Sequence, residues 1–177
     1  MGYTLEELSA DCRAAMDRDS GPAGRDEVRK CIEKACADRE FVATYLGPDN
    51  TTPRQVIYED DKHKFCILAH YYEGAKGSNP HDHGPSWAIY GQASEFTDMA
   101  DWKRQDDGGQ EGHAELERVK EYRLDQARAG LYDIGEIHSI NPAPNARYVR
   151  VTGTDLTKIE RLRFDPDAKE VQIGHPS

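Results

Sequence analysis

Three histidines in this sequence have the residue type and the spacing of a metal site. His81 and His83 lie two residues apart, and His138 follows 55 residues after His83. Residues i and i+2 of a β-strand project from the same face, so the first two imidazoles can point together into a barrel. A third imidazole from another expected strand would close one side of the coordination sphere of zinc, iron, copper or nickel. The alternative is that His81 and His83 are two surface histidines in a turn.

The residues around these histidines resemble the two motifs of the cupin superfamily. A glycine-containing turn leads into the first pair, within residues 77–84 (GSNPHDHG), and the third histidine ends a Gly-x-x-His stretch at 135–138. The first cupin motif usually adds a glutamate ligand four or five residues past its second histidine. Trp87 and Ala88 occupy those positions, and Glu95 is far along the chain. Three neutral imidazoles are therefore the expected ligands.

This three-histidine ligand set, together with the residues around it at 54–155, is similar to the cysteine dioxygenase family of thiol dioxygenases. That resemblance implies a mononuclear Fe(II) ion, O2 and a small anionic substrate, which would be a thiol carboxylate oxidised to its sulfinate. Nickel, manganese or zinc would also suit these ligands. Two alternatives stay open. The chain could be another metal-dependent cupin enzyme, such as a C–C-cleaving dioxygenase, a lyase or an isomerase, or it could be a cupin that binds a ligand without catalysis.

Residues beyond the ligands are assigned by the same resemblance. The family holds its substrate carboxylate with an arginine on an early strand, a position that Arg54 matches, although a surface arginine is equally compatible. The family's serine–histidine–tyrosine relay is missing, because the corresponding alternate residues are Tyr148, Arg150 and Thr152. This departure puts cysteine itself in doubt as the substrate. Arg150 could bind the anion and Tyr148 could donate a proton, or both could be barrel packing.

Three further residues lie near these motifs. Tyr72 and Trp87 are candidates for lining the substrate pocket, against a default of ordinary aromatic packing. Glu136 could be a fourth ligand, but a solvent-facing position at a strand end is favoured. His70 lies in an apolar stretch and is expected to be a core histidine with its polar atoms satisfied.

The elements that must position these residues form a mainly β fold with N-terminal α-helices. Residues 1–50 contain apolar residues at helical spacing, and Thr4 to Glu7 has the sequence of a capping box. Short strands at close spacing follow within 51–177, and residues 104–118 are polar and predict an exposed loop. With 177 residues, we expect one domain, a cupin double-stranded β-helix (jelly-roll barrel) against which the helical segment packs.

Composition limits the partners and the compartment. The net charge of -10 disfavours nucleic acid and anionic membranes, which repel an acidic protein. No apolar run spans a bilayer, no signal peptide is evident, and the four cysteines include no CxxC pair. These features favour a cytoplasmic protein with free thiols. We expect either a monomer or a homodimer.

Overall fold

The computed structural model describes residues 2–74 and 76–174 and begins with three helices. They are α1 (Leu5–Arg18), α2 (Pro22–Ala37) and α3 (Arg39–Leu46). The predicted capping box is confirmed, because the Thr4 hydroxyl accepts from the Glu7 N–H while the Glu7 carboxylate accepts from the Thr4 N–H. Gly21 separates the first two helices, and Pro22 starts the second at a position where its missing N–H costs no hydrogen bond.

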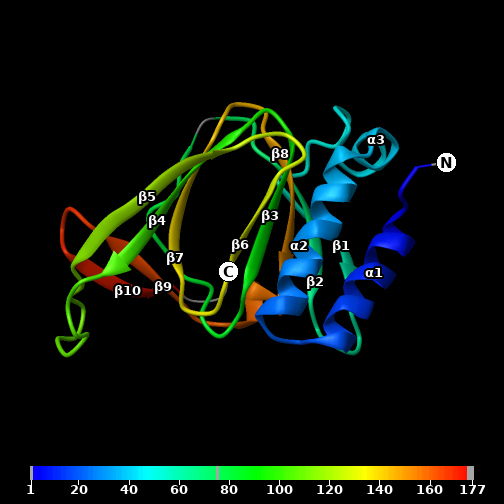
Figure 1. The fold of residues 1–177 in the computed structure, drawn as a ribbon. Coiled ribbons are helices and arrows are strands. Elements are labelled where there is room, and N and C mark those ends of the chain that lie inside the picture. The colour runs from blue at the N-terminus through cyan, green and yellow to red at the C-terminus, as the bar shows by residue number, and fades with distance from the viewer. Residues whose placement is uncertain (1, 75, 175–177) are drawn as a thin grey trace.

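Two antiparallel sheets and a hairpin follow the helices (Figure 1). The larger sheet has the order β1-β2-β8-β3-β6, the smaller sheet has the order β5-β4-β7, and β9 pairs with β10. The strands are β1 (Arg54–Glu59), β2 (Cys66–Tyr71), β3 (Ala88–Ser94), β4 (Thr97–Arg104), β5 (Leu116–Leu124), β6 (Ala129–Tyr132), β7 (Ile137–Pro142), β8 (Arg147–Thr152), β9 (Arg161–Asp165) and β10 (Glu170–Gly174).

The strand order is that of a jelly roll. The segment at His81 forms a bridge to β7 and so adds a short fourth member to the smaller sheet. Each sheet then interleaves strands from the two halves of the chain, so that β8 lies between β2 and β3, and β7 lies between the His81 segment and β4. The expected class, a mainly β double-stranded β-helix with N-terminal helices, is confirmed. The two sheets face each other without closing into a continuous barrel.

The helices cover the outer face of the larger sheet, as Figure 1 shows. Ile32 and Cys36 of α2 pack in one apolar cluster with Ile89, Val149 and Val151 from the sheet. The contact is close enough that a methyl group on Gly91 would lie 2.2 Å from the Ile32 side chain. Burial of this face joins the helical segment to the sheet.

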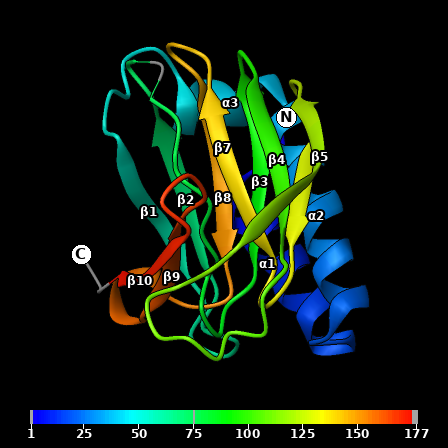
Figure 2. The same ribbon diagram turned by 90° about the vertical axis from the view of Figure 1, so that its left-hand side faces the viewer.

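The strand period decides what faces the interior. On β8, Val149 and Val151 point to the helices, whereas Tyr148 packs in a second cluster between the sheets, with Tyr90, Tyr132 and other residues. Arg150 is in phase with Tyr148 and therefore also points inward. The hairpin β9–β10 lies in front of β2 and β8 in the turned view (Figure 2). It is joined to the His81 segment by the backbone bond from the Phe164 N–H to the Pro80 carbonyl, 2.9 Å.

Some boundaries differ from those expected. The predicted loop at 104–118 is shorter, because β4 extends to Arg104 and β5 begins at Leu116. The start of β5 falls within the predicted loop because the residues of this strand are mainly charged and largely exposed. The four cysteines are free thiols, and three of them are buried. Among the described residues, no helix has the length and apolar character to cross a bilayer.

Candidate metal centre

Backbone pairing brings the first and third histidines together. The His81 N–H donates to the His138 carbonyl at 2.9 Å, and the His138 N–H donates to the His81 carbonyl at 3.0 Å. His138 belongs to β7, which is held on its other side by β4. A contact between residues far apart in the chain is thus fixed by an antiparallel ladder, and the position of the imidazole rings follows from it.

The turn after His81 places His83. The Asp82 carboxylate accepts from the N–H groups of Gly84, at 3.0 Å, and Leu162, at 2.8 Å. Gly84 has a φ of +58°, a backbone conformation that favours glycine. Asp82 therefore ties this turn to β9, and its carboxylate is engaged with backbone rather than with the histidine cluster.

The nitrogen atoms have spacing that suits one metal ion. His83 Nε2 and His138 Nε2 are 3.3 Å apart, and one nitrogen from each of the three rings lies within 4.8 Å of the others. Two nitrogen ligands bound at about 2.1 Å to one tetrahedral ion lie roughly 3.4 Å from each other. The His83–His138 pair therefore already has ligand spacing. The His81 ring would have to move only a short distance toward the other two rings to bind the same ion. Its side chain is the least buried of the three.

The three rings are held in different ways. His81 Nδ1 lies 2.9 Å from the Asn79 carbonyl, which makes Nδ1 the donor and leaves Nε2 free for a metal. The Nδ1 atoms of His83 and His138 are buried and have no hydrogen-bond partner among the described residues. Packing holds these two instead. The Tyr132 ring stacks on His138 with centroids 3.8 Å apart, and the Tyr90 hydroxyl lies 3.2 Å from His83 Nε2.

Burial keeps the three imidazoles neutral. It lowers the pKa of His81 to about 4, and it lowers the pKa of His83 and His138 well below the usual value. The positive charge of Arg150 acts in the same direction on all three. A neutral imidazole is the form that binds a metal, so the environment favours ligation over protonation near neutral pH. The donor set fits a divalent ion of the iron or zinc type.

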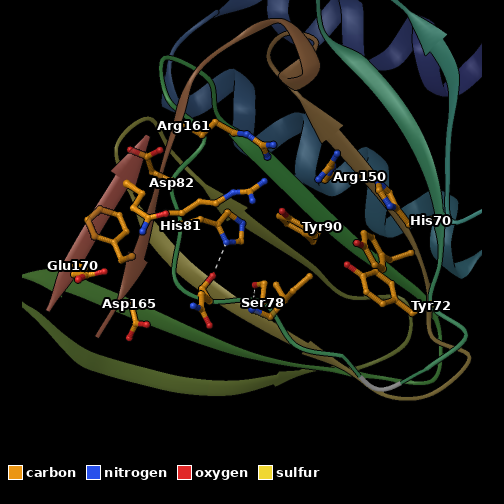
Figure 3. A pocket seen from close by; sticks show the side chains of 16 residues that line it. His70, Tyr72, Ser78, His81, Asp82, Tyr90, Arg150, Arg161, Asp165 and Glu170 are labelled. Carbon is orange, nitrogen blue, oxygen red and sulfur yellow. Dashed lines mark hydrogen bonds between the residues drawn. The ribbon is translucent and has the colours of Figure 1, made fainter. Parts of the chain in front are cut away.

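One member of the cluster, His81, lines a cavity of about 610 Å³ between β2, β7, β8 and the β9–β10 hairpin (Figure 3). This volume suits a small molecule. His81 and Tyr90 lie on its wall, and Arg150 and Arg161 lie at one end in the view of Figure 3. The site therefore combines neutral nitrogen ligands with positive charge beside them.

The structure places three of the five other predicted site residues on this cavity. Tyr72, Tyr148 and Arg150 line it. Arg54 does not: it is 3.7 Å from Asp155 and borders a neighbouring cavity with His70 and Tyr72. Trp87 is also elsewhere, buried in the helix-side core against Gly153. Trp87 is out of phase with Ala88 and Tyr90, which face the interior, and this explains its position.

Three further cavity residues were not identified as site residues from the sequence. His70 is buried as expected, but its Nε2 has no partner among the described residues and its ring stacks on Tyr148. Tyr90 and Arg161 also line the cavity. Alternation along β2 and β3 is the signal that could have shown His70 and Tyr90 facing inward with Tyr148, whereas Arg161 depends on where the hairpin docks.

Glu136 is not part of the cluster. It is exposed, and its carboxylate accepts from the Asp133 N–H at 2.6 Å, which closes the turn before β7. Among the described residues, the ligand group that could hold an ion consists of His81, His83 and His138. The favoured expectation for Glu136, a solvent-facing strand end, is confirmed.

Comparisons with known proteins give distant likenesses in structure. No protein-family model matches the chain, and no curated protein matches it in sequence. Similar solved structures include KdgF from Halomonas sp., at 11% identity and a TM-score of 0.41 over 58% of this chain and 82% of that one. A cupin-2 domain protein from Shewanella frigidimarina is 12% identical, with a TM-score of 0.42 over 55% and 76% of the two chains. A double-stranded β-helix protein from Klebsiella pneumoniae is 14% identical, with a TM-score of 0.40 over 76% and 94%.

The jelly-roll topology and the histidine cluster together define the class. The chain has a cupin-type fold with a three-histidine cluster suited to a divalent metal. The resemblance to cysteine dioxygenases rests on the sequence motifs alone.

Proposed function

We propose that this protein is a metal-dependent enzyme of the three-histidine cupin type, a non-haem Fe(II) dioxygenase that oxidises a small anionic substrate with O2. The observation that carries the proposal is the cluster of His81, His83 and His138, whose member His81 lines a cavity that Arg150 also lines. Three neutral imidazoles would leave both positive charges of a divalent ion uncompensated, and this favours an anionic substrate. When bound, iron supplies the redox chemistry that joins O2 to the substrate.

The first substrate class to test is a thiol carboxylate. Oxidation to the sulfinate forms two S–O bonds and breaks the O–O bond. The sulfur loses four electrons and O2 accepts four, so no other reductant is needed. The resemblance of residues 54–155 to thiol dioxygenases supports this class.

The chain's own residues would bind and orient the substrate. Arg150 provides a positive charge that lowers the pKa of all three histidines, and Arg161 acts in the same direction on His81 and His83. The Tyr90 hydroxyl lies against His83, and Tyr148 and Tyr72 complete the aromatic wall. Buried phenols of this kind exclude water and can hold a proton at the hydroxyl oxygen. Burial raises the pKa of Tyr90 and Tyr148, so both remain protonated donors.

One observation favours a second candidate within the same class. Tyr148, Arg150 and Thr152 replace the serine–histidine–tyrosine relay of thiol dioxygenases. A lyase or isomerase that uses the metal as a Lewis acid would not need this relay. Turnover without O2 would separate this candidate from the dioxygenase.

The test combines metal analysis with O2 uptake. Protein purified without added metal should contain iron, and it should consume O2 only when a thiol acid from a small-thiol panel is present. His83→Ala and His138→Ala should abolish both properties. His113→Ala is the matched control, because this histidine lies outside the cavity lining, beside the β10 edge. Full activity in a ligand variant, or a folded protein that binds no metal, would overturn the proposal.

A further inference from the structure

Two arginines of the histidine cavity have no counter-charge among the described residues. Arg150 lies on β8 and Arg161 begins β9, and both line the cavity. The Nε atom of each is buried and has no hydrogen-bond partner among the described residues. No carboxylate in the described ranges forms an ion pair with either one, whereas Arg123 meets Asp98 at 2.8 Å.

A third polar group joins them from another strand. His70, on β2, is 6% exposed and lines the same cavity, and its Nε2 has no partner among the residues that the structure describes. Its ring is fixed by stacking on Tyr148, with centroids 4.7 Å apart and planes at 8°. Three unsatisfied nitrogen atoms from three elements thus surround one space, as Figure 3 shows for the labelled Arg150, Arg161 and His70.

The carboxylates on the cavity wall do not satisfy this demand. Asp82 accepts from the backbone of Gly84 and Leu162, and Asp165 accepts from the N–H groups of Asp167 and Ala168. Glu170 is exposed at the far edge of the hairpin. These acids hold turns together, so the arginine end of the cavity keeps its positive charge.

Two partly buried guanidinium groups without an anion between them repel each other. Burial lowers the pKa of Arg161, and the positive charges of Arg150 and Arg163 lower it further. Buried charges in proteins are ordinarily paired or hydrogen-bonded. A bound oxyanion would meet both requirements here, because guanidinium groups form charge-assisted bonds with carboxylate or phosphate oxygens.

We propose that Arg150, Arg161 and His70 form a subsite for an oxyanion group that carries two negative charges, of which phosphate is the model. The two guanidinium charges of Arg150 and Arg161 together match the charge of a dianion. Guanidinium donors on β8 and β9 and the neutral imidazole on β2 surround the space in three dimensions, and a tetrahedral group offers three acceptor oxygens where a carboxylate offers two in one plane. This inference rests on the proposed function. It adds that the substrate would carry a dianionic group in addition to the group that binds the metal.

The subsite can be tested with inorganic phosphate and the full-length protein, by isothermal titration calorimetry at pH 8. Wild-type protein should bind one phosphate, and acetate should bind at least tenfold more weakly. Arg161→Met and Arg150→Met should each weaken phosphate binding at least tenfold. Arg123→Met, which removes an exposed arginine on β5, should bind phosphate as wild type does.

Each titration is run on the protein as purified and again after metal removal with a chelator. Phosphate binding that survives chelation and is lost in the arginine variants supports the subsite. Binding that is lost on chelation but unchanged in the arginine variants overturns it, as does equal affinity for acetate. Arg161 is only partly buried, so Arg161→Met decides the test if Arg150→Met does not fold. Phosphate binding by a protein that takes up no metal would overturn the proposed function and leave the subsite standing.

Discussion

The imidazole ring of His138 stacks on the phenol ring of Tyr132, with centroids 3.8 Å apart and an interplanar angle of 30°. The Tyr132 hydroxyl is in turn hydrogen-bonded to the hydroxyl of Tyr122 on β5. Because His138 Nδ1 has no partner among the described residues, this stack is what fixes the ring from behind. The position of a metal ligand on β7 therefore depends on an aromatic residue on β6.

This dependence predicts different effects for two substitutions at position 132. Tyr132→Ala removes the stacked ring and should lower metal affinity about 10- to 100-fold, as loss of a supporting residue commonly does. It should also lower the free energy of unfolding by about 3–5 kcal/mol, the usual cost of truncating a buried aromatic side chain. Competition with a chromophoric chelator measures the affinity, and urea unfolding measures the stability.

Tyr132→Phe is the matched control for the stack. The ring stays, so metal affinity should remain within about threefold of the wild-type value, while the Tyr122 hydroxyl loses its partner at a cost of about 1–3 kcal/mol. Wild-type affinity in Tyr132→Ala would show that the stack does not position His138.

Metal binding itself should stabilise the fold. A ligand that binds only the folded state adds about 2.7 kcal/mol to the free energy of unfolding at a free concentration 100 times its Kd. Addition of Fe(II) under anaerobic conditions, or of Zn(II), should therefore raise the urea midpoint of the wild-type protein. His83→Ala should show no such rise, and a metal-dependent shift in that variant would place the ion at other residues.

The sequence was informative wherever a local pattern determines structure. The spacing of His81 and His83 and the Gly-x-x-His stretch to His138 predicted a cluster that the structure assembles. The capping box at Thr4 was predicted for the same reason, since its bonds join neighbouring residues.

Residues whose environment depends on long-range docking could not be placed in this way. Arg161 reaches the cavity only because the β9–β10 hairpin pairs with the His81 segment, a contact between residues about 80 positions apart. Arg54 matches a family position in sequence, yet the structure places it beside Asp155. Trp87 lies one residue out of phase with the interior positions of β3, and a strand boundary is the least certain part of a sequence-based prediction.

The buried histidines predict how stability depends on pH in the metal-free protein. His70, His83 and His138 have folded-state pKa values well below 6.5, because burial disfavours their charged forms. Below about pH 6.5 the unfolded chain takes up protons at these residues that the folded chain does not. The free energy of unfolding should therefore fall as the pH drops from 6.5 towards 4.5, by up to about 1.4 kcal/mol per pH unit for each histidine.

Urea unfolding at several pH values measures this slope. His70→Gln should reduce it by about one histidine's share, because glutamine does not titrate. A free energy of unfolding that stays constant between pH 6.5 and 4.5 would contradict the neutral state assigned to these imidazoles. Bound metal should reduce the effect of pH, since the ligand nitrogens are then unavailable to protons.

Gly91 allows a final prediction about the contact between the helices and the larger sheet. A Cβ at this position would lie 2.2 Å from Ile32 Cγ2 and 2.9 Å from Cys36 Sγ, so α2 would have to move away from β3. Gly91→Ala should therefore lower the free energy of unfolding by about 1–3 kcal/mol, the typical cost of overpacking. Gly74→Ala is the control, because a Cβ there would meet nothing within 4 Å.

Since β3 also carries Tyr90 on its inner face, Gly91→Ala should weaken metal binding as well if the helices hold the sheet in position. Unchanged metal affinity with reduced stability would show that the metal site is independent of the helical layer.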